Sequence, residues 1–421
     1  MATSTQDMVR SGECVDLYYY DGETSEKQCF PTTQNTKYVV EFSNKSSGSS
    51  VFTIPPQNGI QDIVCEFQIP ALSGSAGQLA ALELPRGWGY ALINQVSFRY
   101  GGSSQYFLTG DQILQAALRK QPSRATVDDL LTLGGNYASA SGGGAGNLDV
   151  AQTANIVLTL PHNIPSGVGK AHPLPTDLLT QQVQVTVELK PLSQVFGKSA
   201  GFTDSNPSII PSALSVAQFA VQQVMLNNQG DALARRVDMA TNAYSFPCEF
   251  IQQVQRIPLN NSAAAQSVVL TGFRSGEVKS IHCWLTRNSD SPANPFNWYL
   301  PASVQMTYAG DVYARYENGS SPLWNLINGN KAPAFDSVVA ADSGTAWTTA
   351  AGLSQWVELP FAQTLVDEDA HHILIHGKPI TNGIVNLLLQ TPSAQSDWVL
   401  NVSYNYNATL LFSQGTCDYV F

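Results

Sequence analysis

The sequence predicts an all-β protein of the sandwich or barrel type, with few short helices and long loops. Many short segments alternate apolar and polar residues with a period of two, which is the pattern of a strand with one buried face. Segments with helical spacing are few and short. The strand-rich segments fall into two halves, and a chain of 421 residues is long enough for each half to bury a core.

The predicted strands follow one another along most of the chain. The clearest is Gln182–Lys190 (QVQVTVELK), which alternates over its whole length. The other predicted strands of the first half are Lys37–Phe42, Ile60–Pro70, Leu92–Tyr100, Asn155–Leu160 and Phe219–Leu226. Those of the second half are Glu249–Ile257, Ser267–Thr271, Lys279–Thr286, Ser303–Tyr308, Gln355–Phe361, Gly383–Gln390, Asp397–Tyr404 and Thr409–Ser413. Many short strands without long intervening helices indicate a β-sandwich or β-barrel.

Three segments have helical character. Asp111–Arg119 starts with an acidic residue and spaces its apolar residues by three and four, Val127–Thr132 is a short candidate, and Asp231–Ala240 follows a glycine near mid-chain. The last of these separates the two strand-rich halves. We therefore expect an N-terminal arm over residues 1–35, a first β-domain over 36–228, a linker with a short helix over 229–248, and a second β-domain over 249–421.

The charge pattern argues against direct nucleic-acid binding. The net charge is −11, and the densest basic pair is Arg235–Arg236, whereas phosphate binding requires clustered Lys and Arg. Charged residues make up only 13% of the chain, compared with roughly 25% in an average protein. Neutral polar surfaces of this kind suit a protein that packs against copies of itself, because they cost less to desolvate than charges.

The cysteines and the N-terminus indicate a soluble protein made in the cytosol. The six cysteines form no C-x-x-C pair, and Cys65 and Cys283 lie within predicted strands, so we expect mostly buried free thiols. The polar stretch Met1–Gly12 lacks the apolar core of a signal peptide. No segment approaches the roughly 20 apolar residues of a membrane-spanning helix.

The sequence favours no catalytic, metal or cofactor site. In Asp367–His376 (DEDAHHILIH), His372 and His376 would share one face of a helix and could bind zinc, but the apolar residues between them favour a strand. Ser166–Ala171 (SGVGKA) lacks the glycine and the hydroxyl of a phosphate-binding loop. No G-x-S-x-G nucleophile motif occurs. We expect a protein that is not an enzyme and binds no cofactor.

Several segments of the first half and the junction, in order, resemble a known family. Phe52–Leu72 pairs two apolar strands around a Pro and Gly turn, and Ile93–Gly102 leads from a strand to paired glycines. Ala171–Lys190 joins a proline-marked segment to the long alternating strand. Gln222–Gln255 contains a strand, an acidic turn and the double arginine. These segments resemble the double jelly-roll major capsid proteins of double-stranded DNA viruses, in the nucleocytoplasmic large DNA virus and polinton-like virus group.

The second half continues the resemblance. Gly276–Leu285 (GEVKSIHCWL) is similar to a family strand that leads to a tryptophan, and Met306–Arg315 is similar to the turn before an outer loop. Thr381–Gln390 and Val399–Phe421 are similar to the family's C-terminal strands. The junction departs from the family pattern, because only Asp231 remains of the usual acidic cluster. Each half has about the number of strands of one eight-stranded jelly roll, so the resemblance implies two consecutive jelly rolls.

The resemblance also implies a structural role in a virion. Family members form pseudo-hexagonal trimers that tile an icosahedral shell, so the implied partners are further copies of the chain and minor and vertex capsid proteins. The expected location is the virion capsid, after synthesis in the host cytoplasm. Aromatic residues are enriched in interface cores, which makes Phe296, Trp298, Tyr299 and Trp324 candidate anchors of the trimer interface or of the outer loops. The alternative for each of them is an ordinary core aromatic.

Three other functions remain open. Low charge and aromatic-rich loops also fit an adhesive or carbohydrate-binding β-sandwich protein, which would bind sugars and form small oligomers. A minor or vertex capsid protein is a second alternative, although two roll-sized halves argue against a protein with a single roll. The third alternative, an enzyme on a β-scaffold, requires a pocket of converging polar groups that the sequence does not reveal.

Overall fold

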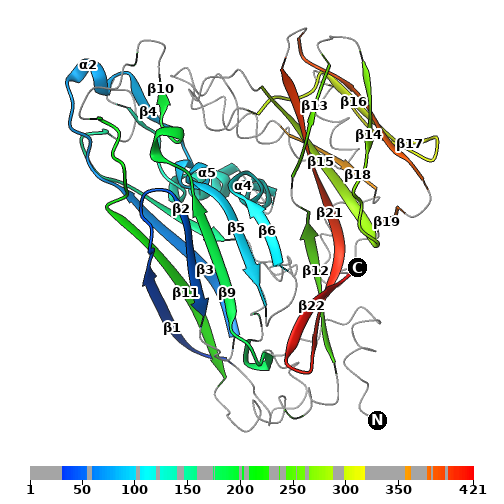
Figure 1. Cartoon of the computed structure of the whole chain (residues 1–421), viewed down its shortest axis with the longest axis horizontal. Coiled ribbons are helices and arrows are strands. Elements are labelled where there is room, and N and C mark those ends of the chain that lie inside the picture. Colours follow the sequence, from blue (N-terminus) through cyan, green and yellow to red (C-terminus); the bar gives the residue numbers. More distant parts are fainter. Residues whose placement is uncertain are drawn as a thin grey trace.

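The computed structural model (Figure 1) places most of the chain in antiparallel sheets. It describes residues 31–54, 59–100, 105–119, 124–139, 147–158, 174, 176–198, 202, 208–226, 237, 243–252, 254–260, 265–287, 298–317, 356–361, 377–380, 383–393 and 397–421. The prediction of an all-β protein is confirmed. No helix in these ranges is long and apolar enough to span a membrane.

The first half is a sandwich of two four-stranded sheets. One has the order β1 (Pro31–Glu41), β11 (Val216–Leu226), β3 (Gly59–Ile69) and β8 (Gln152–Leu158). The other has the order β2 (Gly48–Ile54), β9 (Val183–Leu189), β5 (Ile93–Arg99) and β6 (Gln105–Thr109). The sheets pack face to face, since the ring of Phe52 on β2 stacks on that of Phe219 on β11 with centroids 4.1 Å apart.

The second half repeats this strand order. Its larger sheet runs β12 (Tyr244–Ile251), β21 (Trp398–Ser413), β15 (Glu277–Arg287) and β18 (Val357–Pro360), and its smaller sheet runs β14 (Gln266–Leu270), β20 (Val385–Gln390), β16 (Ser303–Tyr308) and β17 (Asp311–Glu317). The additional strands are β13 (Gln255–Pro258), β19 (Lys378–Pro379) and β22 (Thr416–Val420). In both halves neighbouring strands come from distant parts of the sequence, as in a jelly roll.

Short elements complete the first half. Two helices, α4 (Gly110–Arg119) and α5 (Arg124–Leu133), connect β6 toward β8 and lie between the two halves (Figure 1). The remaining elements are α2 (Ala76–Leu79), α3 (Trp88–Leu92), β4 (Leu82–Leu84), β7 (Ala138–Ser139), β10 (Gly197–Lys198) and the two 3₁₀ turns Thr176–Leu178 and Leu192–Gln194. α4 therefore stands where it can contact both sandwiches.

The structure agrees with most predicted elements and differs at several. The predicted helix at 111–119 corresponds to α4, and the predicted strand at 303–308 has the bounds of β16. The predicted strand at 249–257 is divided between β12 and β13, whereas the two strands predicted at 397–404 and 409–413 form the single strand β21. The domain boundaries stay predictions, and the linker helix expected at 231–240 lies outside the described residues except for Val237.

Candidate functional site

The contact between the two halves begins at the start of α4. The backbone N–H of Thr109 donates to Oε1 of Gln112 at 3.1 Å, and the N–H of Gln112 donates to Oγ1 of Thr109 at 3.3 Å. This reciprocal pair is a capping box, which satisfies N–H groups that the first turn of a helix leaves without partners. The cap also fixes the Gln112 side chain, so its amide nitrogen points away from the helix.

Gln112 joins the first half to the second. Its Nε2 donates to the carbonyl oxygen of Gln252 at 2.8 Å and to Oγ of Ser403 on β21 at 2.9 Å. The Ser403 hydroxyl in turn donates to the same Gln252 carbonyl at 2.9 Å. The buried amide of Gln112 thus uses both its donors and its oxygen, which makes this contact specific in position.

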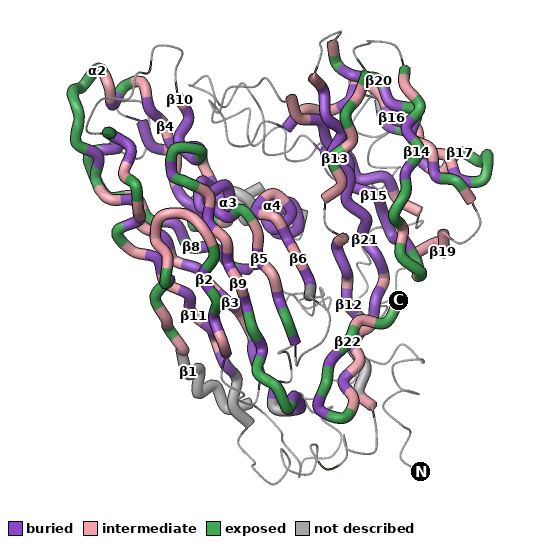
Figure 2. Tube along the Cα trace, viewed as in Figure 1, coloured by how far each residue is buried: buried purple, intermediate pink, exposed green. Residues whose placement is uncertain are grey.

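The sheet face that α4 meets is polar and buried. Ser280 and His282 on β15 pair in register with Asn405 and Ser403 on β21, and all four are buried. An outward-facing sheet surface normally carries polar residues because it contacts water. Here the same residue types are shielded from water (Figure 2), and a buried polar group is costly unless it has a partner inside the protein.

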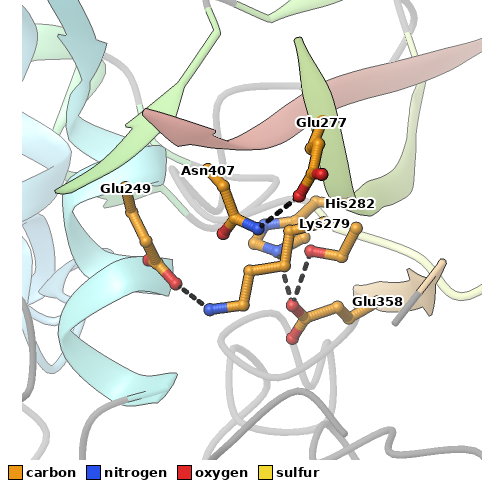
Figure 3. A network of polar contacts seen from close by, with 7 residues as sticks. Glu249, Glu277, Lys279, His282, Glu358 and Asn407 are labelled. Atoms are coloured by element: carbon orange, nitrogen blue, oxygen red, sulfur yellow. Dashed lines mark hydrogen bonds and ion pairs between the residues drawn. The ribbon is translucent and has the colours of Figure 1, made fainter. Parts of the chain in front are cut away.

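A buried contact between a histidine and a carboxylate lies on this face (Figure 3). Nε2 of His282 is 3.1 Å from Oε1 of Glu358 on β18, and both side chains are 4% exposed. The Ser280 hydroxyl donates to the same carboxylate oxygen at 2.8 Å. Hydrogen bonds of this kind offset the desolvation of a buried carboxylate. At 4% exposure the pair has no open approach for a substrate, so its geometry fits a structural role.

A second polar group continues along the same strands (Figure 3). The Lys279 ammonium forms an ion pair with Glu249 on β12, and Nδ2 of Asn407 donates to Oε2 of Glu277 at 3.4 Å. Asn407 lies on the central strand and pairs in register with Glu249 on one side and Glu277 on the other. The larger sheet of the second half is therefore tied together across three strands by side chains as well as by its backbone.

Aromatic rings from both halves pack together farther along β12 and β22. The ring of Tyr106 on β6 lies 5.1 Å from that of Phe250 on β12 and 5.9 Å from that of Tyr419 on β22. Tyr100 lies 6.4 Å from Tyr419. The Tyr106 hydroxyl also accepts a hydrogen bond from the backbone N–H of Ile251 at 3.4 Å. Such aromatic contacts add to apolar burial, so this cluster joins the halves where the polar contact ends.

The buried cysteine and tyrosine side chains in this region stay neutral. Burial raises the pKa of the Cys248 thiol and of the Tyr419 hydroxyl well above their ordinary values, and it raises the pKa of the Cys283 thiol to about 12. All four cysteines in the described residues are free and buried, as predicted from the sequence. A buried neutral thiol is unreactive, which argues against a nucleophilic role for them.

Trp298 lies at the contact between the halves. Its side chain hydrogen-bonds the carboxyl group of Asp111 on α4, and its ring lies 6.4 Å from Trp284 and 6.1 Å from Trp356. The indole is buried within the chain, in line with the alternative that the predicted anchor aromatics are core residues. Tyr299 is half-buried with its ring 5.1 Å from Trp398. The other two, Phe296 and Trp324, lie outside the described residues, and the anchor role of all four stays a prediction.

The described ranges contain no group of three or more side chains suited to hold a metal ion. The predicted alternative zinc ligands His372 and His376 lie outside these ranges, as does the glycine-containing segment at 166–171. Sequence reasoning did not find Gln112, Ser403 or Glu358. Their only signal was a polar residue inside an otherwise strand-like or helix-like run, for example the glutamate in QWVELPF.

Comparisons with known proteins relate the fold to capsid proteins. No family model matches the chain, and no curated protein is similar to it in sequence. The chain is similar to PBCV-1 VP54, in a crystal structure fitted into a reconstruction of the virophage Sputnik, at 13% identity and a TM-score of 0.60, covering 92% of this chain and 97% of that one.

Two further solved structures have the same arrangement. The Faustovirus major capsid protein is 11% identical with a TM-score of 0.57, and 97% of each chain is covered. The mavirus major capsid protein is 10% identical with a TM-score of 0.51, covering 92% of this chain and 90% of that one. At these identities the likeness concerns the fold. The chain has the double jelly-roll fold that these viral major capsid proteins share, as the sequence predicted.

Proposed function

We propose that the chain is the major capsid protein of a double-stranded DNA virus and acts as a structural protein, not as an enzyme. Three copies would form a pseudo-hexagonal capsomer, and capsomers would tile an icosahedral shell. The observation that carries this proposal is the pair of jelly rolls with one strand order, joined into a single unit by Gln112 and by the aromatic cluster around Tyr106. A unit with two similar lobes is what a six-lobed trimer requires.

The composition supports the same proposal. With a net charge of −11, the protein would contact its own copies and minor and vertex capsid proteins in the virion, and it would not contact the genome directly. Synthesis would take place in the host cytoplasm. Neutral polar surfaces would allow close packing without the cost of burying many charges.

The solution mass of the purified full chain tests the proposal. Light scattering after size exclusion should give about three chain masses, and the complex should resist moderate salt, because apolar burial is not screened by ions. A monomer at all concentrations would contradict the preformed capsomer. A monomer or dimer that binds a specific glycan in an array would instead favour the carbohydrate-binding alternative.

A further inference from the structure

An apolar row crosses the outer face of one sheet in the first half. Val39 on β1 pairs in register with Ala220 on β11, Ala220 with Val64 on β3, and Val64 with Val157 on β8. Val39 and Val157 are 50% and 41% exposed, and the two central residues are half-buried. Residues in register on neighbouring strands share a face of the sheet. The four side chains therefore form one continuous row that the described residues leave partly exposed.

Polar residues border this line. The next row on the same face consists of Glu41, Gln218, Glu66 and Asn155, which are paired across the same four strands. An apolar strip with a polar margin is the arrangement of a protein interface, which has an apolar core and a solvated rim. A single exposed valine needs no explanation, but a row that spans a whole sheet does.

In the second half, the equivalent outer face of the larger sheet is covered by another part of the chain. Its larger sheet has the same strand order, and its outer face carries a row of Ser403, His282 and Glu358 on the strands that correspond to β11, β3 and β8. That row is buried, and Gln112 on α4 of the first half contacts it directly. Within one chain, the first half thus covers the outer sheet face of the second half.

We infer that the row Val39–Ala220–Val64–Val157 is the docking surface for the second half of another copy of this chain. The contact between copies would continue the interface that already joins the two halves within one chain. β1 and β11 lie on the side of the first half away from the second half, and β14, β16 and β17 lie on the opposite outer side (Figures 1 and 2). A contact between these two different faces is head-to-tail, and such contacts close into a ring when the rotation between neighbouring copies permits it.

The far side of the second half carries matching apolar residues. β17 holds the same place in its sheet as β6, the strand that precedes α4 in the first half. Val312 on β17 is 58% exposed, and Val269 on β14 and Leu388 on β20 are also exposed on this sheet. Apolar side chains on both faces would become buried together in the contact. This inference rests on the proposed self-association and specifies which surfaces make it.

Three variants of the full chain test the surface by light scattering. The first carries Val39→Glu and Val157→Glu, the second carries Val312→Glu, and the matched control carries Val51→Glu. Val51 is 61% exposed on β2 and Val312 is 58% exposed, so the control adds one carboxylate, as the second variant does, at a valine away from the row. Circular dichroism and urea unfolding confirm that each variant folds like the wild type. The first two should fall from about three chain masses to one, and the control should stay at three.

The outcomes separate this inference from the proposed function. If the wild type is a trimer and the Val39/Val157 variant is too, the docking surface is wrong and the proposed function stands. If the Val39/Val157 variant is a monomer but the Val312 variant stays a trimer, the partner face is wrong. A wild type that dimerises through the row alone would indicate a contact between two identical faces. A monomeric wild type would overturn the proposed function and this inference together.

Discussion

Glu358 is the residue on which the buried polar face depends most. One carboxylate oxygen accepts a hydrogen bond from the Ser280 hydroxyl and pairs with His282, and water does not reach the group. A buried pair of this kind adds little to stability compared with apolar residues of similar volume, but removal of one partner leaves the other without compensation. Glu358 therefore stabilises the fold mainly by giving buried Ser280 and His282 a shared acceptor.

Replacement of Glu358 should be costly. We expect Glu358→Ala to lower the free energy of unfolding by about 3–5 kcal/mol, because His282 and Ser280 would lose a shared acceptor in a buried site. Glu358→Gln should cost less, since its amide oxygen can still accept. Urea unfolding measures both. The exposed Asp418→Asn is the control, and an equally small effect for Glu358→Ala would show that the pair does not stabilise the fold.

The buried carboxyl group of Asp111 should make the stability of the fold depend on pH. Its Oδ1 atom is shielded from water without a hydrogen-bond partner, and burial raises the pKa of its carboxyl group. The folded protein then holds this proton more tightly than the unfolded chain. The stabilisation is fully present below the unfolded pKa of about 3.9 and is lost as the pH rises through the folded pKa.

Asp111→Asn should remove this dependence of stability on pH, because an amide does not titrate. The oxygen of the new asparagine can still accept a hydrogen bond from the Trp298 indole. Urea unfolding at pH 4 and pH 7 measures this. As the pH rises from 4 to 7, the free energy of unfolding should fall more, or rise less, in the wild type than in the variant. Equal changes in the two proteins would contradict a raised Asp111 pKa.

At the scale of elements, α4 holds the two halves in register. Gln112→Ala removes the side-chain oxygen that accepts from the Thr109 N–H and both hydrogen bonds to the second half. We expect a loss of about 2–3 kcal/mol, the sum of a cap and a buried hydrogen-bond group. Chemical denaturation monitored by tryptophan fluorescence would measure it.

Gln115 is the matched control on the same helix. Its amide is buried and neither atom has a hydrogen-bond partner, so Gln115→Leu should leave the stability unchanged or raise it by about 1 kcal/mol. If Gln112→Ala were as mild as Gln115→Leu, the α4 contact would not hold the halves together.

The elements also show what the sequence can predict. β9 alternates because one face meets the sandwich core and the other meets water, so its period of two identifies it directly. β21 is buried on both faces over its first half, so it lacks a clear alternation there, and the sequence predicted two separate strands at 397–404 and 409–413. The covering residues come from α4, which is far away in the sequence. Burial by a distant element leaves no local pattern, which is why Gln112, Ser403 and Glu358 were not predicted.

At the scale of the whole molecule, two similar jelly rolls are joined through different faces. The first half uses α4 and β6 to contact the larger sheet of the second half, while its own larger sheet stays open at Val39 and Val157. The equivalent sheet face is covered in one half and open in the other, and such a chain is suited to make a similar contact with its neighbours. This asymmetry is the structural basis of the proposed capsomer.

Cryo-electron microscopy of the purified full chain would show how the copies associate. We expect particles with three-fold symmetry and six similar lobes, one for each jelly roll, with the row from Val39 to Val157 buried between neighbouring copies. Particles with only the two lobes of a single chain, or dimers joined through identical faces, would contradict this expectation.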